Sequence, residues 1–388
     1  MKALRTILYI LTLVLTLGAC KEPYSPVVKT LPNNLLVVEG MINTGPDSTF
    51  IKLSRTTLLD QKMAVLVETG AMVNIESDAN DSYSLKELGS GSYTVGPSNL
   101  SQTKKYRLRI KTKDGKIYLS DFVDTKVSPP IDSITWEAKQ DGLQLYSHTH
   151  DEQNKSRYYK WEYTDNWEFN ASFRSTSVTN GKEVVDRDMT ADNIFTCWDA
   201  GKSSTIMIGT SARLAKDQIN KGLLNFIPAN AEKISVKYSI LVKQQVLTKE
   251  GFDFWERLQK NTENLGSIFD AQPSQLAGNI HNVSDPAEPV IGFISAGTVQ
   301  QKRIFIAKDK LPTNWNSTYP YLCYQLDTLY IVNPRTGARD EDKYFQTRLF
   351  VPINPVFIDG ELKGHTRSTK ECADCTIRGT NKKPIFWQ

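Results

Sequence analysis

Short runs of alternating apolar and polar residues, separated by turn residues, fill the chain from residue 35 to residue 127. Run 105–112 (KYRLRIKT) puts its aromatic and aliphatic residues on one face and its basic residues on the other, as in a half-buried strand. Seven short strands within about 90 residues predict an immunoglobulin-like β-sandwich. Besides 105–112, the predicted strands are 35–42, 49–54, 71–77, 82–88, 91–95 and 116–123.

A second β-rich domain is predicted after Ser128-Pro129-Pro130, because consecutive prolines interrupt strand pairing and mark a boundary. The pattern therefore assigns residues 35–128 to the first domain and 131–388 to a larger β-sandwich-like domain with one or two short helices. The longest alternating run covers 233–246, and residues 165–199 form a polar insert without clear periodicity. We expect a mainly β chain.

The hydrophobic period changes to that of a helix at 249–260. Thr248 is a candidate N-cap, and Phe252, Trp255 and Leu258 recur three residues apart on one face. Farther along the chain, two apolar runs on either side of Gly297 predict a hairpin. The tail after residue 370 is rich in Cys, Gly and Pro, so we expect disulfide bonds rather than regular structure to hold it in place.

The first residues have the pattern of a secretory signal. Lys2 and Arg5 precede a short apolar run, and Leu17-Gly18-Ala19-Cys20 is similar to the lipobox of bacterial lipoproteins. We therefore expect a signal peptide over 1–19 and acylation of Cys20, followed by a tether over 20–34 that leaves the folded body clear of the lipid. The apolar run is too short to favour a permanent membrane-spanning helix. The alternative is an ordinary cleaved signal in which Cys20 occurs by chance.

Four further cysteines suggest disulfide bonds, because an even number in an exported chain is typical of a disulfide framework. Three pairings are possible, and the sequence does not choose among them. Zinc or redox chemistry at the Cys-x-x-Cys pair is the alternative, although no strand and helix flank it as in thioredoxin-like proteins. The four residues are Cys197, Cys323, Cys372 and Cys375.

Composition and motifs exclude several functions. The chain has 47 basic and 43 acidic residues, so it lacks the charge of a nucleic-acid-binding protein. Nucleophile elbows, phosphate-binding loops, dinucleotide fingerprints and HExxH helices are absent from the sequence, so we expect no catalytic residues and no cofactor. His148, His150 and Asp151 are the one candidate metal cluster, since alternation along a strand would put both histidines on one face. The alternative, which we favour, is a polar strand end that leads into a solvated loop.

Aromatic residues provide the candidate binding surface. Trp167 and Phe169 enter the polar insert, and Phe269 lies in the irregular stretch 265–281. Rigid aromatic side chains with polar neighbours suit ligand or protein contacts. The alternative is that these side chains belong to a strand core or cover a sheet edge.

Several segments together resemble the Bacteroidota lipoproteins grouped as domain of unknown function 4249. These segments are the lipobox with EPYSP, LLVVEGMI, IKLSRT, FDFWERLQKNTENLGSIFDAQPSQLAGNI, VIGFISAG and CADCTIRGTNKKPIFW. The resemblance implies an outer-membrane lipoprotein, often encoded near a TonB-dependent transporter. It implies no catalytic residues.

The sequence thus predicts a lipid-anchored binding or accessory subunit of the outer membrane, with a membrane-protein partner and no nucleic acid. Its ligand, and the membrane face on which it lies, stay open. Two alternatives remain: a metal-assisted hydrolase centred on His148 and His150, and a structural surface protein.

Overall fold

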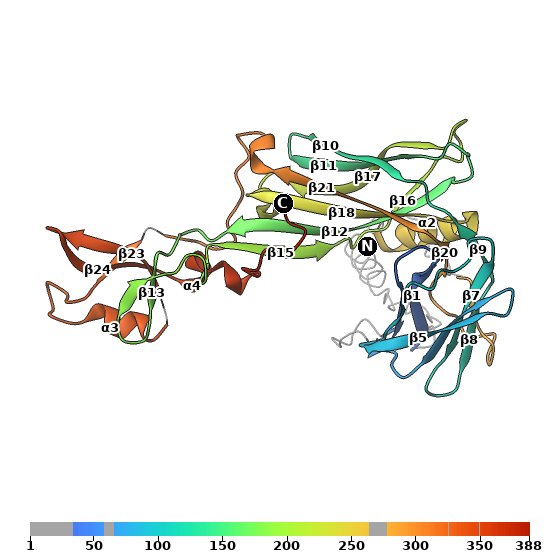
Figure 1. Ribbon diagram of the computed structural model, residues 1–388, viewed down its shortest axis with the longest axis horizontal. Coiled ribbons are helices and arrows are strands. Elements are labelled where there is room, and N and C mark those ends of the chain that lie inside the picture. The colour runs from blue at the N-terminus through green and yellow to red at the C-terminus, as the bar shows by residue number, and fades with distance from the viewer. Residues whose placement is uncertain (1–33, 58–65, 264–277, 325, 349) are drawn as a thin grey trace, which may run out of the picture.

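The computed structural model describes residues 34–57, 66–263, 278–324, 326–348 and 350–388. Three parts follow one another in space: a first body at one end, a sandwich of two sheets in the middle, and an arm that projects from the far side of the sandwich (Figure 1). The predicted mainly β fold is confirmed. No described helix has the length and apolarity needed to cross a membrane.

The first body is a closed ring of strands. Hydrogen-bonded neighbours follow the order β7-β4-β5-β6-β2-β1-β20-β9, and β9 pairs with β7, which closes a ring of these eight strands. β3 is attached to β2, β8 to β7, and β19 to β8. The bounds are β1 Leu36–Asn43, β2 Thr49–Arg55, β3 Leu66–Val67, β4 Met72–Ser77, β5 Ser82–Gly89, β6 Ser92–Val95, β7 Lys105–Lys111, β8 Ile117–Ser120, β9 Val123–Lys126, β19 Ile280–Asn282 and β20 Ala296–Gly297.

Residues 278–298, which we call the returning segment, complete this ring. β20 pairs in parallel with β1 on one side and with β9 on the other. Ile294 and Ala296 of this segment are buried in the core of the ring. The predicted hairpin at Gly297 is therefore wrong, because the chain leaves β20 for the other body instead of turning back. The first body is therefore not contiguous in the sequence. The predicted range 35–128 omits the returning segment, whose strand β20 pairs with β1 and β9.

The middle part packs a three-stranded sheet, β10-β11-β17, against a five-stranded sheet, β15-β12-β18-β21 with β16 beside β12. Alternation along β18 buries Tyr238, Ile240 and Val242 completely between the two sheets. The bounds are β10 Ile131–Ala138, β11 Gly142–His150, β12 Tyr158–Asn170, β15 Thr196–Lys202, β16 Met207–Thr210, β17 Gln218–Pro228, η1 Glu232–Ile234, β18 Lys237–Val246, α2 Lys249–Glu263, β21 Val299–Ala307 and η2 Lys308–Lys310.

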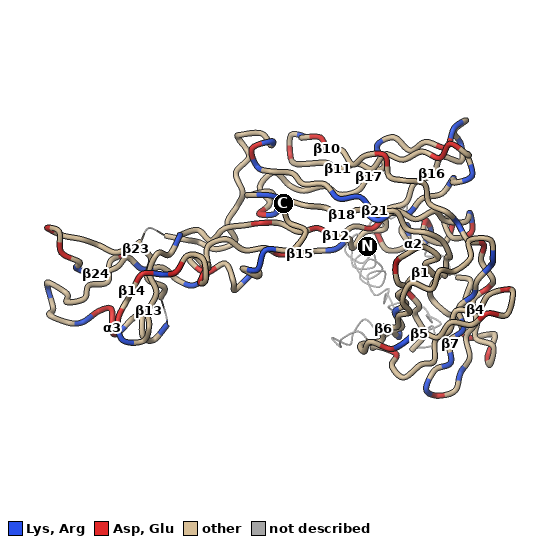
Figure 2. Tube along the Cα trace, in the orientation of Figure 1, with Lys and Arg blue, Asp and Glu red and all other residues tan. Residues whose placement is uncertain are grey.

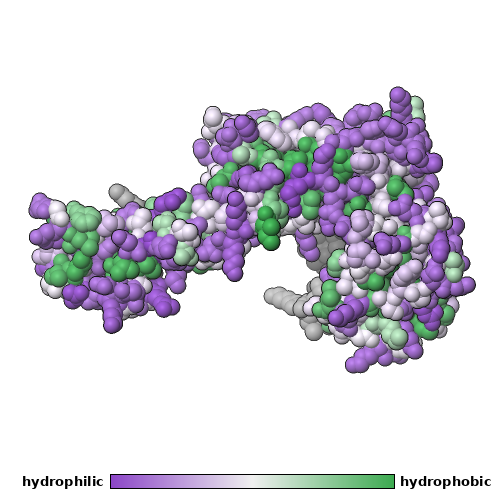
Figure 3. Space-filling view, viewed as in Figure 1, coloured by the Kyte–Doolittle hydropathy of each residue, from purple (hydrophilic) through white to green (hydrophobic). Residues whose placement is uncertain are grey.

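The arm begins where β12 ends, and the chain returns from it at the beginning of β15 (Figure 1). Its two small sheets are β13-β14 and β22-β24-β23, and its free end exposes Phe357, Ile358 and Leu362, where hydrophobic surface gathers in Figure 3. The bounds are β13 Ser177–Thr179, β14 Val184–Asp186, β22 Asp327–Tyr330, α3 Asp340–Phe345, β23 Val351–Ile358, β24 Glu361–Ser368, α4 Lys370–Ala373 and η3 Cys375–Ile377.

Disulfide bonds hold the tail, as the sequence predicts. Cys197 at the start of β15 pairs with Cys375, and Cys323 pairs with Cys372. Of the three possible pairings, this one joins the tail both to the five-stranded sheet and to the segment that leads into the arm. The tail also forms two short helical turns, α4 and η3, which the sequence did not predict.

Candidate ligand-binding cleft

A cleft of about 500 Å3 lies where the ring, the five-stranded sheet and helix α2 meet. Clefts between domains are a common place for ligand binding. The ring contributes Glu39, Gly40, Met41, Asn43, Asp47, Ser48, Phe50, Phe293 and Ser295; the sheet contributes Lys160, Glu162, Lys243, Gln244, Gln245, Val299 and Gln301; the helix contributes Trp255.

The ring wall follows from the two-residue period of its strands. Ile42 and Ile294 point into the ring and are fully buried, so their neighbours face outward. Asn43 precedes the turn into β2, and Ser295 precedes β20, which pairs with the end of β1. Both side chains line the cleft and are nearly buried, with 7% and 8% of their surface exposed.

The floor is the outer face of the five-stranded sheet. Glu162 of β12 is the register partner of Lys243 of β18, which in turn is the partner of Gln301 of β21. Lys160 lies two residues before Glu162 on the same face, because Trp161 between them is buried in the core between the sheets. The floor is therefore charged and polar.

Helix α2 forms the remaining wall and contacts both bodies. The predicted helix at 249–260 is confirmed, and the Thr248 hydroxyl accepts a hydrogen bond from the Gly251 amide at 3.2 Å, as an N-cap does. The Phe252 ring lies 5.1 Å from that of Tyr158 on β12, and the Phe254 ring 5.6 Å from that of Phe293 in the returning segment. These contacts hold α2 across the junction, and Trp255 faces the cleft.

Lys160 links the helix to the floor. Its ammonium lies 4.1 Å from the centre of the Trp255 ring and donates a hydrogen bond to Glu162. Burial raises the pKa of Glu162, but the charge of Lys160 and this hydrogen bond outweigh burial, so its net pKa is lowered. Glu162 therefore stays ionised at neutral pH, and the Lys160 side chain is held in place on two sides.

Direct hydrogen bonds fix the two bodies against each other beside the cleft. The Gln301 side-chain amide donates to the Asp47 carboxylate at 2.8 Å, from the sheet to the ring. Where the chain passes between the two bodies, the Ser128 amide donates to the Thr298 hydroxyl at 2.9 Å, and the Ser128 hydroxyl accepts from the Val246 amide at 2.9 Å. These bonds join the ring to the five-stranded sheet beside the cleft.

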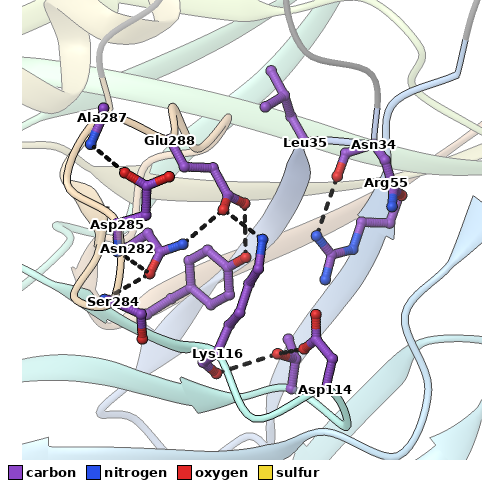
Figure 4. A network of polar contacts seen from close by, with 12 residues as sticks. Asn34, Leu35, Arg55, Asp114, Lys116, Asn282, Ser284, Asp285, Ala287 and Glu288 are labelled. Carbon is purple, nitrogen blue, oxygen red and sulfur yellow. Dashed lines mark hydrogen bonds and ion pairs between the residues drawn. The ribbon is translucent and has the colours of Figure 1, made fainter.

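A carboxylate network attaches the returning segment to the ring (Figure 4). Glu288 accepts hydrogen bonds from Lys116 at 2.7 Å, Tyr118 at 2.8 Å and Asn282 at 2.7 Å. Burial raises the pKa of Glu288, but these three donors together lower it below its ordinary value. Through this attachment, the network positions Phe293 and Ser295 in the cleft wall.

The histidine cluster lies outside the cleft, at the end of β11. His148 is within 2.7 Å of the Thr135 hydroxyl, and the His150 Nδ1 is 2.8 Å from the Asp132 carboxylate. The Asp151 carboxylate accepts three backbone hydrogen bonds from its own loop, residues 153–156. Within the described part of the chain, no group of three or more His, Cys, Asp or Glu side chains could hold a metal ion.

The aromatic candidates take structural positions. Trp167 and Phe169 belong to β12, not to an irregular insert. Phe169 is 1% exposed and has no surface to offer a ligand, and Trp167 is half-buried beneath Lys233, whose ammonium lies 4.3 Å from its ring. Phe269 and the lipidation candidate Cys20 lie outside the described residues.

Sequence reasoning did not single out the residues that line the cleft. The sequence pattern places Trp255 only on an apolar helix face and singles out neither Lys160 nor Glu162. Lys160 and Glu162 are the part of the sequence that could have indicated a polar surface here, since two charges within an aromatic strand require either solvent or a polar partner. The strand pattern could not indicate that the ring would lie opposite them.

The fold defines a β protein of several parts with a cleft between two of them. The chain belongs to the family described as domain of unknown function DUF4249, whose model matches residues 21–303. No curated protein matches the chain. Among solved structures, a two-domain fibronectin type III segment of chicken tenascin is similar over 56% of this chain and 93% of its own, with 11% identity and a TM-score of 0.16. A likeness that weak carries no argument about function.

Proposed function

We propose that this protein is a lipid-anchored binding subunit of the outer membrane that captures a ligand in the cleft and works beside a membrane-protein partner, such as a TonB-dependent transporter. The observation that carries the proposal is the cleft itself. It combines aromatic walls with a charged floor and is held open by hydrogen bonds between the bodies. Such a combination of apolar surface and a few placed polar groups is typical of ligand sites.

The family match supports the choice of the cleft over the arm. Every residue that lines the cleft lies between 39 and 301, within the matched range 21–303. The sheet β22-β24-β23 of the arm lies beyond that range. A function common to the family therefore has its best candidate in the cleft.

A lipid anchor at Cys20 would suit an accessory role. An acyl chain at Cys20 would hold the body within a tether's length of its partner, which raises the local concentration of the cleft there. The mixed surface charge, with basic and acidic residues interspersed over all three parts, suits a protein partner better than a nucleic acid (Figure 2).

The test is co-purification of the tagged full chain from detergent-solubilised native membranes, followed by mass spectrometry. We expect an acylated N-terminal peptide and one membrane protein in stoichiometric amount. The Cys20→Ala variant should lose the acyl group and most of the partner. Recovery of the protein without acyl group or partner would overturn the proposal.

A further inference from the structure

The charged residues that line the cleft are distributed unevenly between its ring wall and its floor. Glu39 and Asp47 are on the ring, whereas both lysines, Lys160 and Lys243, are on the floor of the cleft, together with Glu162. The ring side is therefore acidic. In total, three carboxylates face two ammonium groups, so the cleft favours a neutral or cationic ligand over an anion.

The two ring carboxylates lie at the rim. The Glu39 side chain is 58% exposed, and its nearest cation is Lys52 at 3.8 Å, at the outer limit of an ion pair. Asp47 is exposed and accepts one hydrogen bond, from a neutral amide, Gln301. Phe50, 59% exposed, belongs to the same lining, and an aromatic face attracts cations.

The inner part of the same wall presents hydrogen-bond donors. The carbonyl of the Asn43 side chain accepts from the Gly45 amide at 2.8 Å, which leaves its amino group as the donor. Among the described residues, neither that amino group nor the Ser295 hydroxyl has a hydrogen-bond partner. Both residues are mostly buried and line the cleft, and their two donor groups open onto it, so a bound acceptor could take both hydrogen bonds.

We propose that the cleft binds an organic cation that also carries a carbonyl group, the chemistry of a basic residue within a peptide. The cation lies on the acidic ring side of the cleft, to which Glu39, Asp47 and Phe50 belong, and the carbonyl oxygen accepts hydrogen bonds from Asn43 and Ser295. The apolar part of the ligand packs on Met41 and Trp255. This inference rests on the proposed binding function and names the ligand class of the same site.

The test is titration of the full chain in detergent by calorimetry with blocked tripeptides. N-acetyl-Ala-Arg-Ala-amide should bind, and its citrulline and glutamate analogues should bind at least tenfold more weakly. Citrulline keeps the shape of arginine without its charge, and glutamate reverses the charge. Ethylguanidinium, which has the cation of arginine without a peptide carbonyl, is titrated for comparison. Weaker binding of ethylguanidinium than of the peptide supports a peptide source, and equal binding assigns the site to small cations and removes the carbonyl contact.

Variants that keep side-chain shape locate the site. Glu39→Gln and Asp47→Asn should each weaken binding of the arginine peptide roughly threefold to tenfold and reduce its dependence on salt. Ser295→Ala should weaken peptide binding but leave ethylguanidinium unaffected. The matched control is Glu361→Gln, which removes one exposed carboxylate on the arm and should change nothing. Thermal unfolding of each variant checks that it is folded.

Equal binding of the arginine and citrulline peptides, or arginine binding unchanged by both ring variants, would overturn the proposal. Neither result would touch the accessory role if a membrane partner still co-purifies. Conversely, cation binding without a partner would remove the accessory role and leave the ligand class in place.

Discussion

Gly297 lies so close to Lys126 that a Cβ on the glycine would be 2.3 Å from the Lys126 carbonyl oxygen. This close approach closes the ring, because β20 fits between β1 and β9 only with a minimal side chain at this position. Gly297 and Lys126 are the last residues of β20 and β9, and after each of them the chain passes from the ring to the middle part. The ring is therefore closed next to the hydrogen bonds of Ser128 and Thr298 that join it to the second body.

Gly297→Ala tests this closure directly. The added methyl group must push β20 away from β9, so we expect a loss of about 1–3 kcal/mol in the free energy of unfolding, the usual cost of overpacking. The measurement is denaturant unfolding of the full chain. Gly96→Ala is the control, because a Cβ there meets nothing within 4 Å, and it should be neutral or slightly stabilising. Equal effects of the two substitutions would contradict the account.

The ring should not fold from its N-terminal strands alone. A fragment of residues 34–130 leaves β1 and β9 unpaired along one edge and exposes the core that Ile294 and Ala296 cover. We expect no cooperative unfolding transition by circular dichroism and little protection from hydrogen exchange. The same fragment with residues 278–298 joined by a flexible linker should recover both. A cooperative transition of the short fragment would show that the returning segment is dispensable.

The two disulfide bonds should differ in their contribution to stability. Cys197–Cys375 spans 178 residues and Cys323–Cys372 spans 49. In the chain-entropy model, the longer loop gives about 1 kcal/mol more stabilisation. Comparison of the two double Cys→Ser variants by denaturant unfolding gives the difference. Thiol titration of the unfolded, unreduced wild type should detect neither pair as free thiols. A larger cost for the shorter loop would indicate that native packing, not loop closure, dominates.

Acid should weaken the attachment of the returning segment. The pKa of Glu288 in the folded protein is below its ordinary value of 4.5, so its contribution is complete above that value and is lost as the pH falls through the folded pKa. At pH 7, Glu288→Gln should reduce the free energy of unfolding by about 1–2 kcal/mol, because an amide cannot accept from all three donors. The difference between wild type and variant should shrink below about pH 4.5. A difference that is independent of pH would exclude this carboxylate as the cause.

The sequence predicted individual strands better than their partners. The sequence pattern predicts a strand in the run that contains β20, yet its parallel neighbour, β1, precedes it by more than 200 residues. A period of two residues states which face is buried and says nothing about which strand covers it. The cleft depends on that pairing and on the position of α2, so no local pattern could have predicted it.

Asp165 explains the most misleading part of the pattern. It occupies an inward position of β12 between the aromatic positions 161, 163, 167 and 169, and it is completely buried. An acid in that place made the apolar alternation appear to end, and the following residues resembled a loop. In the fold, its carboxylate accepts hydrogen bonds from Lys233 at 2.7 Å and Tyr238 at 3.1 Å. Because these partners come from distant parts of the sequence, local reading could not identify them.

The most direct test of the central claim, that this protein captures its ligand in the cleft, is photo-crosslinking in the native cell. A photoreactive phenylalanine analogue replaces Gln245 on the cleft floor in one strain and Lys86 on the outer surface of the ring in another. We expect one dominant adduct from position 245 in the mass spectrum of the purified protein, absent from position 86. No adduct at 245, or the same adducts at both positions, would contradict the account.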